Sequence, residues 1–378
     1  MIFKKEDLAF LNTYAHFSNN NEDLNSKVQV TFDNVNNRIC FCLSTIGDVR
    51  GLAFMTIFDN VEDIKDNFFS VYDIISLNRI IQLSQQDTKI KFTEEGIFFD
   101  NESKYELKKY EYPIPEYNTL LDYIYNKTPS KTIHLIDLEK LKPCISFVGE
   151  TITEVNKNSV FLDMVVSRNK HYISSNEDVT SIVKTSNSIE DLFYISKNVA
   201  TVIQYCKLKE IDIDIYEKEN QFKFKIGDTY VFSSMITQSS IPDVFDDDIK
   251  SYYDHKSCII VDRKELLTAV ERLKVVTRKV FSINIKKDSI TIENKVAPYA
   301  IETIKATVDE ELINSNLLLS SIFFSTIVSI FNGDKIKIKV PSDLANNVAI
   351  GVEDETQDKI IIQCLYEEVQ FTMDDGEI

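Results

Sequence analysis

The sequence predicts an α+β protein of three tandem two-layer domains, each a doubled β-α-β-β-β unit. Two observations lead to this fold class: a helix-like apolar run occurs three times, and three short strand-like runs follow each copy. The recurring windows are 71–77, 195–201 and 319–325, and their first residues lie 124 positions apart, twice. A unit of secondary structure that repeats at a fixed period indicates an architecture of equivalent packed units.

The runs that follow each window are short, rich in β-branched and aromatic residues, and partly alternate apolar with polar residues, as strands with one buried face do. They cover 89–92, 96–99 and 105–107 in the first copy, 211–215, 222–226 and 230–232 in the second, and 336–340, 348–352 and 359–362 in the third.

The first half of each third follows the same plan. Apolar strand residues lead into an acidic or polar helix start and then a core leucine, and further alternating strands follow. The openings are 2–8, 135–141 and 260–266, and the later strands are 27–32, 160–165 and 281–285. The chain therefore consists of six half-units, each with one helix and about four strands, with helices on one side of antiparallel sheets.

The helix expected over 262–279 has an apolar stripe of Leu266, Val270 and Leu273. Four residues lie on the opposite face at about 100° per residue. This face is either an ordinary solvated surface or a surface that binds phosphates. The pattern of this one helix favours the solvated surface. The four residues are Lys264, Thr268, Arg272 and Lys279.

Two linkers, 113–131 and 239–256, divide the chain into domains 1–127, 128–254 and 255–378. Both linkers begin with an Ile-Pro pair, at Pro115 and Pro242, and proline stops a strand from continuing its ladder. A short acidic tail, 367–378, follows the third copy.

Composition excludes several function classes. The net charge of −18 argues against a protein that binds DNA with its whole surface. Only eight glycines are present, without the usual phosphate-binding loops, and the four histidines stand far apart. No apolar run approaches the roughly 18 residues of a membrane span, and residues 1–7 do not form a signal peptide. We expect a cytoplasmic protein that does not bind membranes.

The best candidate for a catalytic cluster is Asp243, Asp246, Asp247 and Asp248. Such a group could hold a divalent metal, but it lies in a proline-led linker without glycine turns or ligand spacing. A solvated run of charge is favoured. We expect no metal, no cofactor and no catalytic site.

Of the six cysteines, Cys40 and Cys42 lie in one strand-like run. Their side chains then point to the same face and are too close for a normal disulfide. We expect both to be buried, small apolar residues.

The threefold plan and its register resemble the bacterial-type β sliding clamp of replicative DNA polymerases. The resemblance covers the whole chain and is most specific over 230–277, and residues 348–354 and 360–365 are similar to the family's last two strands. It implies a non-catalytic processivity factor, half of a six-domain ring. Two chains would join head to tail and encircle duplex DNA without sequence preference, and the partners would be a DNA polymerase and a clamp loader.

The resemblance also implies sites. The helices would line the hole of the ring with Lys5, Arg79, Lys140, Lys142, Lys197, Lys207, Lys264, Arg272 and Lys279. A pocket for partner peptides would involve Ser174, Asn176, Val179, Pro242, Val244, Ile362, Cys364 and Leu365. The dimer interface would involve Tyr105 and Leu107 in a strand over 104–110, with Val275 and Val276. For each basic residue the competing interpretation is ordinary surface solubility, and for the apolar interface residues it is core packing.

Most of the pocket departs from the family pattern. The loop around Ser174 and the chain end from Gln363 onward differ from the family's usual sequences. This departure indicates a divergent member, from a virus or mobile element with its own replication partners. Two alternatives stay open: a clamp-like ring that tethers a viral RNA polymerase or nuclease, and a metal-dependent enzyme that uses residues 243–248.

Overall fold

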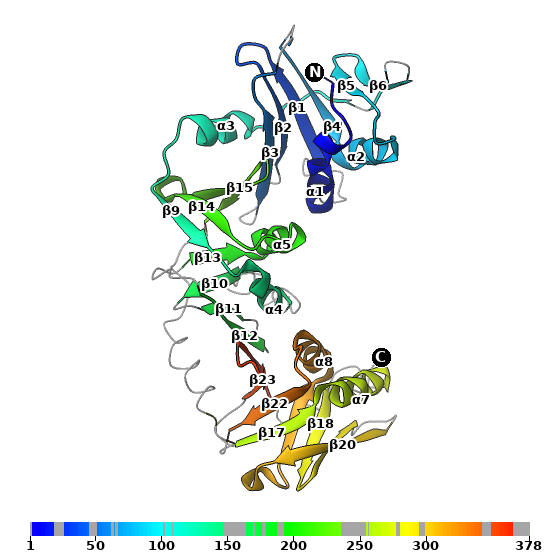
Figure 1. Cartoon of the computed structure of the whole chain (residues 1–378), viewed down its shortest axis with the longest axis vertical. Helices are drawn as coiled ribbons and strands as arrows, with labels where there is room; N and C mark the ends of the chain where they lie inside the picture. The colour runs from blue at the N-terminus through cyan, green and yellow to red at the C-terminus, as the bar shows by residue number, and fades with distance from the viewer. Residues whose placement is uncertain are drawn as a thin grey trace. The chain divides into compact units, whose positions relative to one another are not determined.

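The computed structural model describes residues 2–18, 26–44, 51–61, 64, 67–100, 103–107, 109–146, 164–168, 171–175, 179–186, 193–235, 255, 257–276, 280–294, 299–341 and 349–365, with the backbone alone for 164–168, 175, 193, 194 and 197. The chain forms two compact units, Met1–Leu138 with Asn198–Thr237, and Glu139–Lys197 with Gln238–Ile378. Figure 1 labels the helices and most of the strands of both units.

The first unit contains two antiparallel sheets. The strands of the larger sheet are β1 (Lys27–Asp33), β2 (Arg38–Ser44), β3 (Leu52–Phe58), β4 (Phe68–Asp73), β8 (Lys109–Tyr110), β9 (Lys131–Leu135), β14 (Ile211–Tyr216), β15 (Gln221–Ile226) and β16 (Thr229–Ser234). They run in the order β8-β4-β1-β2-β3-β16-β15-β14-β9. The smaller sheet has the order β5-β6-β7 and consists of β5 (Ile90–Thr93), β6 (Gly96–Phe99) and β7 (Ser103–Tyr105).

Helices cover both faces of the larger sheet. They are α1 (Phe10–Phe17), α2 (Ile74–Leu83), α3 (Tyr117–Tyr125) and α5 (Lys197–Tyr205), with short 3-10 turns at Glu6–Leu8, Leu138–Leu141 and Glu217–Glu219. On one face, Phe10 of α1 packs edge-on against Phe41 of β2, with ring centroids 5.2 Å apart. On the other face, Tyr117 and Leu120 of α3 pack in one cluster with Cys40 and Cys42.

Helix α3 lies inside the segment that the sequence predicts as a linker. Tyr117, Leu120 and Tyr123 recur every third residue and are buried, so the helix presents one apolar stripe to the sheet. Buried Lys223 of β15 fastens its end, because the Nζ donates to the carbonyl oxygen of Tyr123 at 2.8 Å and to the hydroxyl of Tyr216 at 2.7 Å. The helix therefore closes the second face of the sheet.

The second unit is built on one twelve-stranded antiparallel sheet. Its strands are β10 (Met164–Arg168), β11 (His171–Ser175), β12 (Val179–Lys184), β13 (Phe193–Ser196), β17 (Ser257–Asp262), β18 (Val280–Lys286), β19 (Ser289–Asn294), β20 (Ala300–Val308), β21 (Asn316–Ser320), β22 (Lys335–Val340), β23 (Ala349–Asp354) and β24 (Lys359–Cys364). The order is β13-β10-β11-β12-β24-β23-β22-β17-β20-β19-β18-β21. The helices are α4 (Lys142–Ile145), α7 (Arg263–Val276) and α8 (Ser321–Ile330), with a 3-10 turn at Glu310–Leu312.

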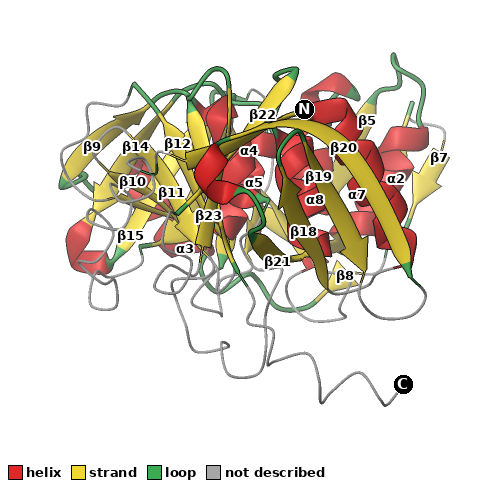
Figure 2. Cartoon of the chain, turned by 90° about the horizontal axis from the view of Figure 1, so that it is seen from below, coloured by secondary structure: helices red, strands yellow, loops and turns green. Residues whose placement is uncertain are grey.

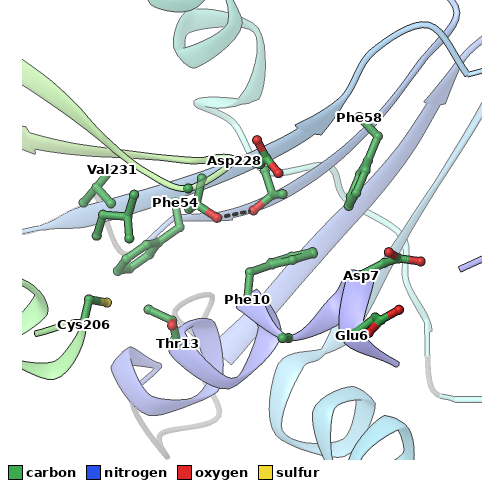
Figure 3. A pocket seen from close by; sticks show the side chains of 14 residues that line it. Glu6, Asp7, Phe10, Thr13, Phe54, Phe58, Cys206, Asp228 and Val231 are labelled. Atoms are coloured by element: carbon green, nitrogen blue, oxygen red, sulfur yellow. Dashed lines mark hydrogen bonds between the residues drawn. The ribbon is translucent and has the colours of Figure 1, made fainter. Parts of the chain in front are cut away.

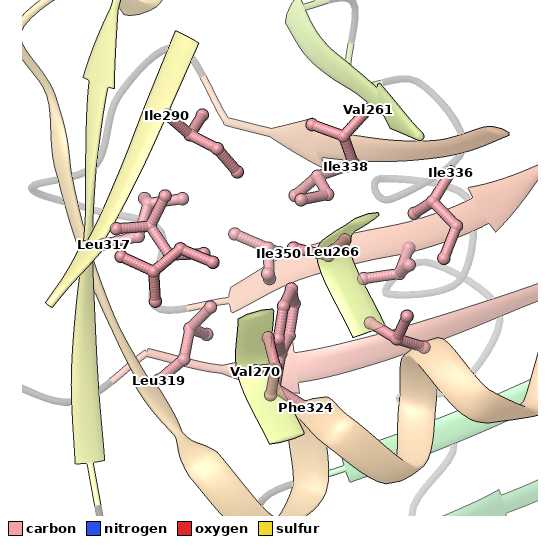
Figure 4. Close-up of a cluster of buried hydrophobic side chains, with 14 of the residues drawn as sticks. Val261, Leu266, Val270, Ile290, Leu317, Leu319, Phe324, Ile336, Ile338 and Ile350 are labelled. Atoms are coloured by element: carbon pink, nitrogen blue, oxygen red, sulfur yellow. The ribbon is translucent and has the colours of Figure 1, made fainter. Parts of the chain in front are cut away.

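Helices α7 and α8 lie side by side and share the main core of this unit (Figure 2). Leu266 and Val270 of α7 meet Phe324 of α8 over strand residues such as Ile338 and Leu319 (Figure 4). All five side chains are fully buried, and burial of each contributes about 1.5–3 kcal/mol. The apolar stripe expected on α7 is confirmed.

The threefold repeat is confirmed in the structure. In each copy a strand runs directly into a helix, at β4–α2, β13–α5 and β21–α8, and the three expected strands follow. The residues before the helices are Asp73, Ser196 and Ser320, all of a type that caps helix N-termini. The side chain of Asp73 accepts a hydrogen bond from the backbone N–H of Ser76 at 2.7 Å. The Ser320 hydroxyl likewise accepts a hydrogen bond from the backbone N–H of Phe323 at 3.5 Å, so α2 and α8 begin at the same capped point of the repeat.

Backbone ladders join successive thirds within each unit. Strand β3 pairs with β16 through Thr56 and Thr229, and β12 pairs with β24 through Thr180 and Ile362. As a consequence, the middle third of the chain is split: Asn198–Thr237 belongs to the first unit and Glu139–Lys197 to the second. The borders of the three domains, at 127/128 and 254/255, stay a prediction.

The two cysteines of β2 point to the same face, as expected. Both are buried and unoxidised. Burial raises the pKa of Cys40 to about 11, and it raises the pKa of Cys42 well above the ordinary value. Burial also raises the pKa of Cys144 to about 12. These thiols are packing residues and are protonated at neutral pH.

We predict that alkylation divides the six cysteines into two groups. Iodoacetamide attacks the thiolate, so Cys40, whose pKa is about 11, should react at least about a hundredfold more slowly at pH 8 than an exposed thiol with a pKa of about 8.5. Its rate should rise about tenfold per pH unit up to its pKa. Peptide mass spectrometry would measure this, with urea-unfolded protein as the control. Equal labelling of all six thiols in folded protein would contradict the prediction. The slow group is Cys40, Cys42 and Cys144, and the fast group is Cys206, Cys258 and Cys364.

Candidate functional site

The clearest candidate surface for nucleic acid is the outer face of α7. The Asp262 carboxylate accepts a hydrogen bond from the backbone N–H of Glu265 at 2.9 Å and so caps the helix start. Since the stripe through Leu266 is buried, Lys264, Thr268 and Arg272 are exposed on the other side. The arrangement predicted from helical spacing is therefore present, except that Lys279 lies outside the described residues.

Acidic neighbours neutralise part of this basic face. The guanidinium of Arg272 holds the Glu302 carboxylate of β20 with two contacts, at 2.9 and 3.1 Å. Lys274, also on α7, contacts Glu271 at 3.5 Å and donates to the hydroxyl of Ser325 on α8 at 2.9 Å. Among the exposed cations of α7, Lys264 is thus the one without an acidic partner in the described residues.

Lys5 has a structural partner. Its Nζ donates to the backbone oxygens of Gln82 and Ser84, at 2.5 and 3.1 Å, at the end of α2. Arg263, which opens α7 at the corresponding point of the repeat, likewise donates to the oxygen of Gly333 just after α8, at 3.0 Å. A cation is favourable at a helix C-terminus because it satisfies carbonyl oxygens and opposes the helix dipole. The signal for this role is the repeat itself, since both residues occupy one aligned position.

The remaining basic candidates differ in their exposure and in whether their side chains have partners. Arg79 on α2, Lys207 just after α5, and Lys264 are exposed, and none of their side chains has a hydrogen-bond or ion-pair partner among the described residues. Lys207 adopts a left-handed conformation with φ of 53°, which ends α5. Lys142 is exposed at the start of α4, Lys140 is half-buried with a partner, and nothing is described of the Lys197 side chain.

Sequence reasoning missed one further lysine at a helix end. Lys359 at the start of β24 donates to the carbonyl oxygen of Ile330 at 3.1 Å and lies over the ring of Phe331. Burial lowers the pKa of Lys359, and the nearby carboxylates of Asp354 and Asp358 offset this only in part. No local sequence pattern indicates this contact, because it joins the end of α8 to a strand 29 residues later.

The β12–β24 ladder places the predicted pocket residues on neighbouring strands but on two faces of the sheet. Val179 pairs with Gln363, so its side chain lies on the opposite face from those of Ile362 and Cys364. Ser174 is buried and donates to the carbonyl oxygen of Cys144 at 2.7 Å. Val179 and Ile362 are also buried, whereas Cys364 and Leu365 are half-buried. Asn176, Pro242 and Val244 lie outside the described residues.

The predicted interface strand over 104–110 is two strands in the structure. Ser103–Tyr105 forms β7 and pairs with β6, whereas Lys109–Tyr110 forms β8 and pairs with β4 in the larger sheet. The single-strand prediction was wrong because the chain changes sheets between these segments, which the alternation of residues does not reveal. Tyr105 and Val275 are exposed, at 45% and 82%, and Leu107 and Val276 are half-buried.

The part of the chain that the structure describes holds no group of three or more His, Cys, Asp or Glu side chains arranged to bind a metal. Residues 243–248 lie outside that part. None of the described helices is long and apolar enough to cross a membrane.

Solved structures with a similar fold are DNA polymerase III β subunits. The chain is similar to the β subunit from Pseudomonas aeruginosa, with 11% identity over 97% of this chain and 99% of that chain and a TM-score of 0.74. It is similar to Caulobacter crescentus pol III β, with 11% identity, the same coverage and a TM-score of 0.75. It is also similar to a putative DNA polymerase III β subunit from Eubacterium rectale, with 14% identity over 97% of this chain and 98% of that chain and a TM-score of 0.73. The chain therefore has the sliding-clamp fold that the sequence predicts.

No family model matches the sequence, and no curated protein matches it. The fold is thus preserved at an identity where sequence comparison alone finds no relative.

We predict that Lys5→Met destabilises the protein and that Arg79→Ala does not. Methionine keeps the apolar stem of Lys5 and removes the bonds to the end of α2, which should lower the free energy of unfolding by about 1 kcal/mol. Arg79 lies on α2 itself, and its side chain has no partner among the described residues. Its loss should therefore change the free energy of unfolding by less than about 0.5 kcal/mol. Urea denaturation followed by circular dichroism would compare them, and equal midpoints would contradict the capping role.

Proposed function

We propose that this protein is a DNA sliding clamp, a non-catalytic factor that encircles duplex DNA as a head-to-tail homodimer. The main support is the clamp fold over 97% of the chain, with exposed cations on helices in both units. The proposal places the chain at replicating DNA, where it would tether a DNA polymerase and require a clamp loader.

The charge distribution suits retention by enclosure. A net charge of −18 opposes adsorption to phosphates, and Arg79, Lys207 and Lys264 are spread over three helix regions. A ring needs only weak, non-directional phosphate contacts, because topology keeps it on the DNA. Strong contacts would hinder sliding.

The internal repeat supports a specific dimer interface. Strands β3, β12 and β20 occupy equivalent places in the three copies, and so do β16, β24 and β7. The first two pairs, β3–β16 and β12–β24, join inside the chain. The third pair, β20 and β7, would join between two chains and close the ring.

Both strands of this third pair are available within the described residues. Strand β7 pairs only with β6. Residues 300–305 of β20 pair only with β19, because β17 contacts β20 at 306–308. A free strand edge with exposed apolar neighbours, Tyr105 on β7 and Ile301 on β20, favours pairing with another chain. Val275 at the end of α7 would contribute apolar area.

The polymerase would bind by a short peptide near the β12–β24 ladder. Cys364 and Leu365 offer partly exposed apolar side chains there, and buried Ile362 lies on the same face of β24 as Cys364. Pro242 and Val244 would complete this pocket.

Retention on circular DNA tests the proposal. Protein dissociated by dilution is reconcentrated with a nicked circular plasmid and separated from free protein by gel filtration. The clamp should co-elute with the circle and be released when a single cut linearises it. Linear DNA blocked at both ends should retain it. Equal retention on open linear and circular DNA, or none on circles under conditions where the dimer forms, would overturn enclosure.

We predict that Ile301→Asp weakens the dimer. A carboxylate buried at the strand junction lacks a partner, so the dimer dissociation constant should rise more than about tenfold. Val35→Asp is the matched control, because Val35 is similarly exposed, at 76% against 64%. Native mass spectrometry should find twice the 43.6 kDa of one chain in the wild type and the control, and mainly single chains in the variant. A dimer of unchanged affinity in Ile301→Asp would contradict this interface.

A further inference from the structure

A cavity of about 500 Å³ opens in the first unit where β3 meets β16 (Figure 3). Its lining comes from the first helical turns of the chain, from β3, from the turn between β15 and β16, and from Cys206 after α5. Its volume lies in the range of about 300–1,000 Å³ that is typical of ligand pockets. It is formed by residues other than those predicted for the peptide pocket, which belong to the second unit.

Aromatic rings form the walls of this cavity. Phe54 is fully buried, whereas Phe10 and Phe58 are half-buried and their ring centroids lie 6.2 Å apart. In Figure 3 both of these rings face the open space. The faces of such rings attract an apolar group or a cation.

Hydroxyl groups on the adjoining strands satisfy one another. The side-chain oxygens of Thr56 and Thr229 are 2.7 Å apart, and Thr56 also lies 3.0 Å from the hydroxyl of Tyr14. These hydroxyls already have partners, so polar recognition of a ligand falls to the rim.

The rim is acidic. Glu6, Asp7 and Asp228 line the cavity, and none of the described lining residues is Lys, Arg or His. The Asp7 carboxylate accepts a hydrogen bond from the backbone N–H of Lys4 at 2.7 Å. Glu6 and Asp228 are exposed, and their carboxylates have no partner among the described residues. This rim repels phosphate and attracts a cation.

The position of Asp228 depends on the turn before it. Ile226 pairs with Thr229, which leaves Gly227 and Asp228 as a two-residue turn. Gly227 has φ of 57°, a conformation that glycine adopts without strain. The turn thereby holds the carboxylate over the aromatic walls.

We propose that this cavity binds a partner-protein segment in which an arginine stands next to a bulky apolar residue. The guanidinium would lie over Phe10 or Phe58 and contact the carboxylates of Glu6 and Asp228. The apolar neighbour would pack against the other of these two half-buried rings. Arginine suits the site better than lysine because its planar group stacks on rings and bonds carboxylates at the same time. The proposal does not rest on the encirclement of DNA.

Fluorescein-labelled pentapeptides test the proposal on the full chain. Three libraries share randomised apolar flanks and have a central arginine, lysine or citrulline. Anisotropy at low salt should rank arginine above lysine and lysine above citrulline, and 0.3 M NaCl should weaken the arginine peptides. Methyl resonances of Ile226 and Val231 should shift as they bind.

The double variant Glu6→Gln with Asp228→Asn should weaken binding of the arginine peptides about three- to tenfold, as expected for two partly exposed ion pairs. Asp87→Asn with Glu94→Gln is the control, because it removes the same charge from exposed residues of the same unit. The proposal is overturned if both variants lose affinity equally, if citrulline peptides bind as well as arginine peptides, or if the Ile226 and Val231 resonances do not move.

Discussion

The structure depends on the pairing of strand edges from successive repeats. An antiparallel sheet leaves an unpaired row of N–H and C=O groups at each edge. Here the last strand of one copy satisfies an edge of the copy before it, through Phe54 and Val231 in the first unit and Ile182 and Ile360 in the second. Because these junctions are backbone ladders, they tolerate wide changes of sequence. This tolerance accounts for a clamp fold that persists at 11% identity.

Few of the basic residues near the described helices are free to meet an external ligand. Several cations near the helices have structural tasks: Lys5, Arg263 and Lys359 satisfy carbonyl oxygens at helix ends, and Arg272 holds Glu302. The cations that remain free are dispersed. A protein that held DNA by affinity would concentrate them instead. The dispersed pattern is consistent with a surface that passes along the duplex.

The first unit also contains a negatively charged surface. Helix α3 and Lys223 close one face of the nine-stranded sheet, while the other face has an acidic, aromatic cavity beside the β3–β16 junction. A repeat junction thus provides both the backbone pairing that builds the chain and a concave surface formed by two copies. A cavity between repeats can change its lining residues without breaking the ladder, so such junctions are suited to acquire partners.

The sequence by itself determined the repeat, the apolar stripe of α7, and the shared face of Cys40 and Cys42. These features depend on neighbours within a few residues, and periodicity records them directly. Tertiary structure decided the rest: the cover that α3 forms over β2, the change of sheets after Tyr105, the partner of Lys5, and the cavity that joins Phe10 to Asp228. Each depends on contacts between segments far apart in the chain, which packing selects and no local pattern encodes.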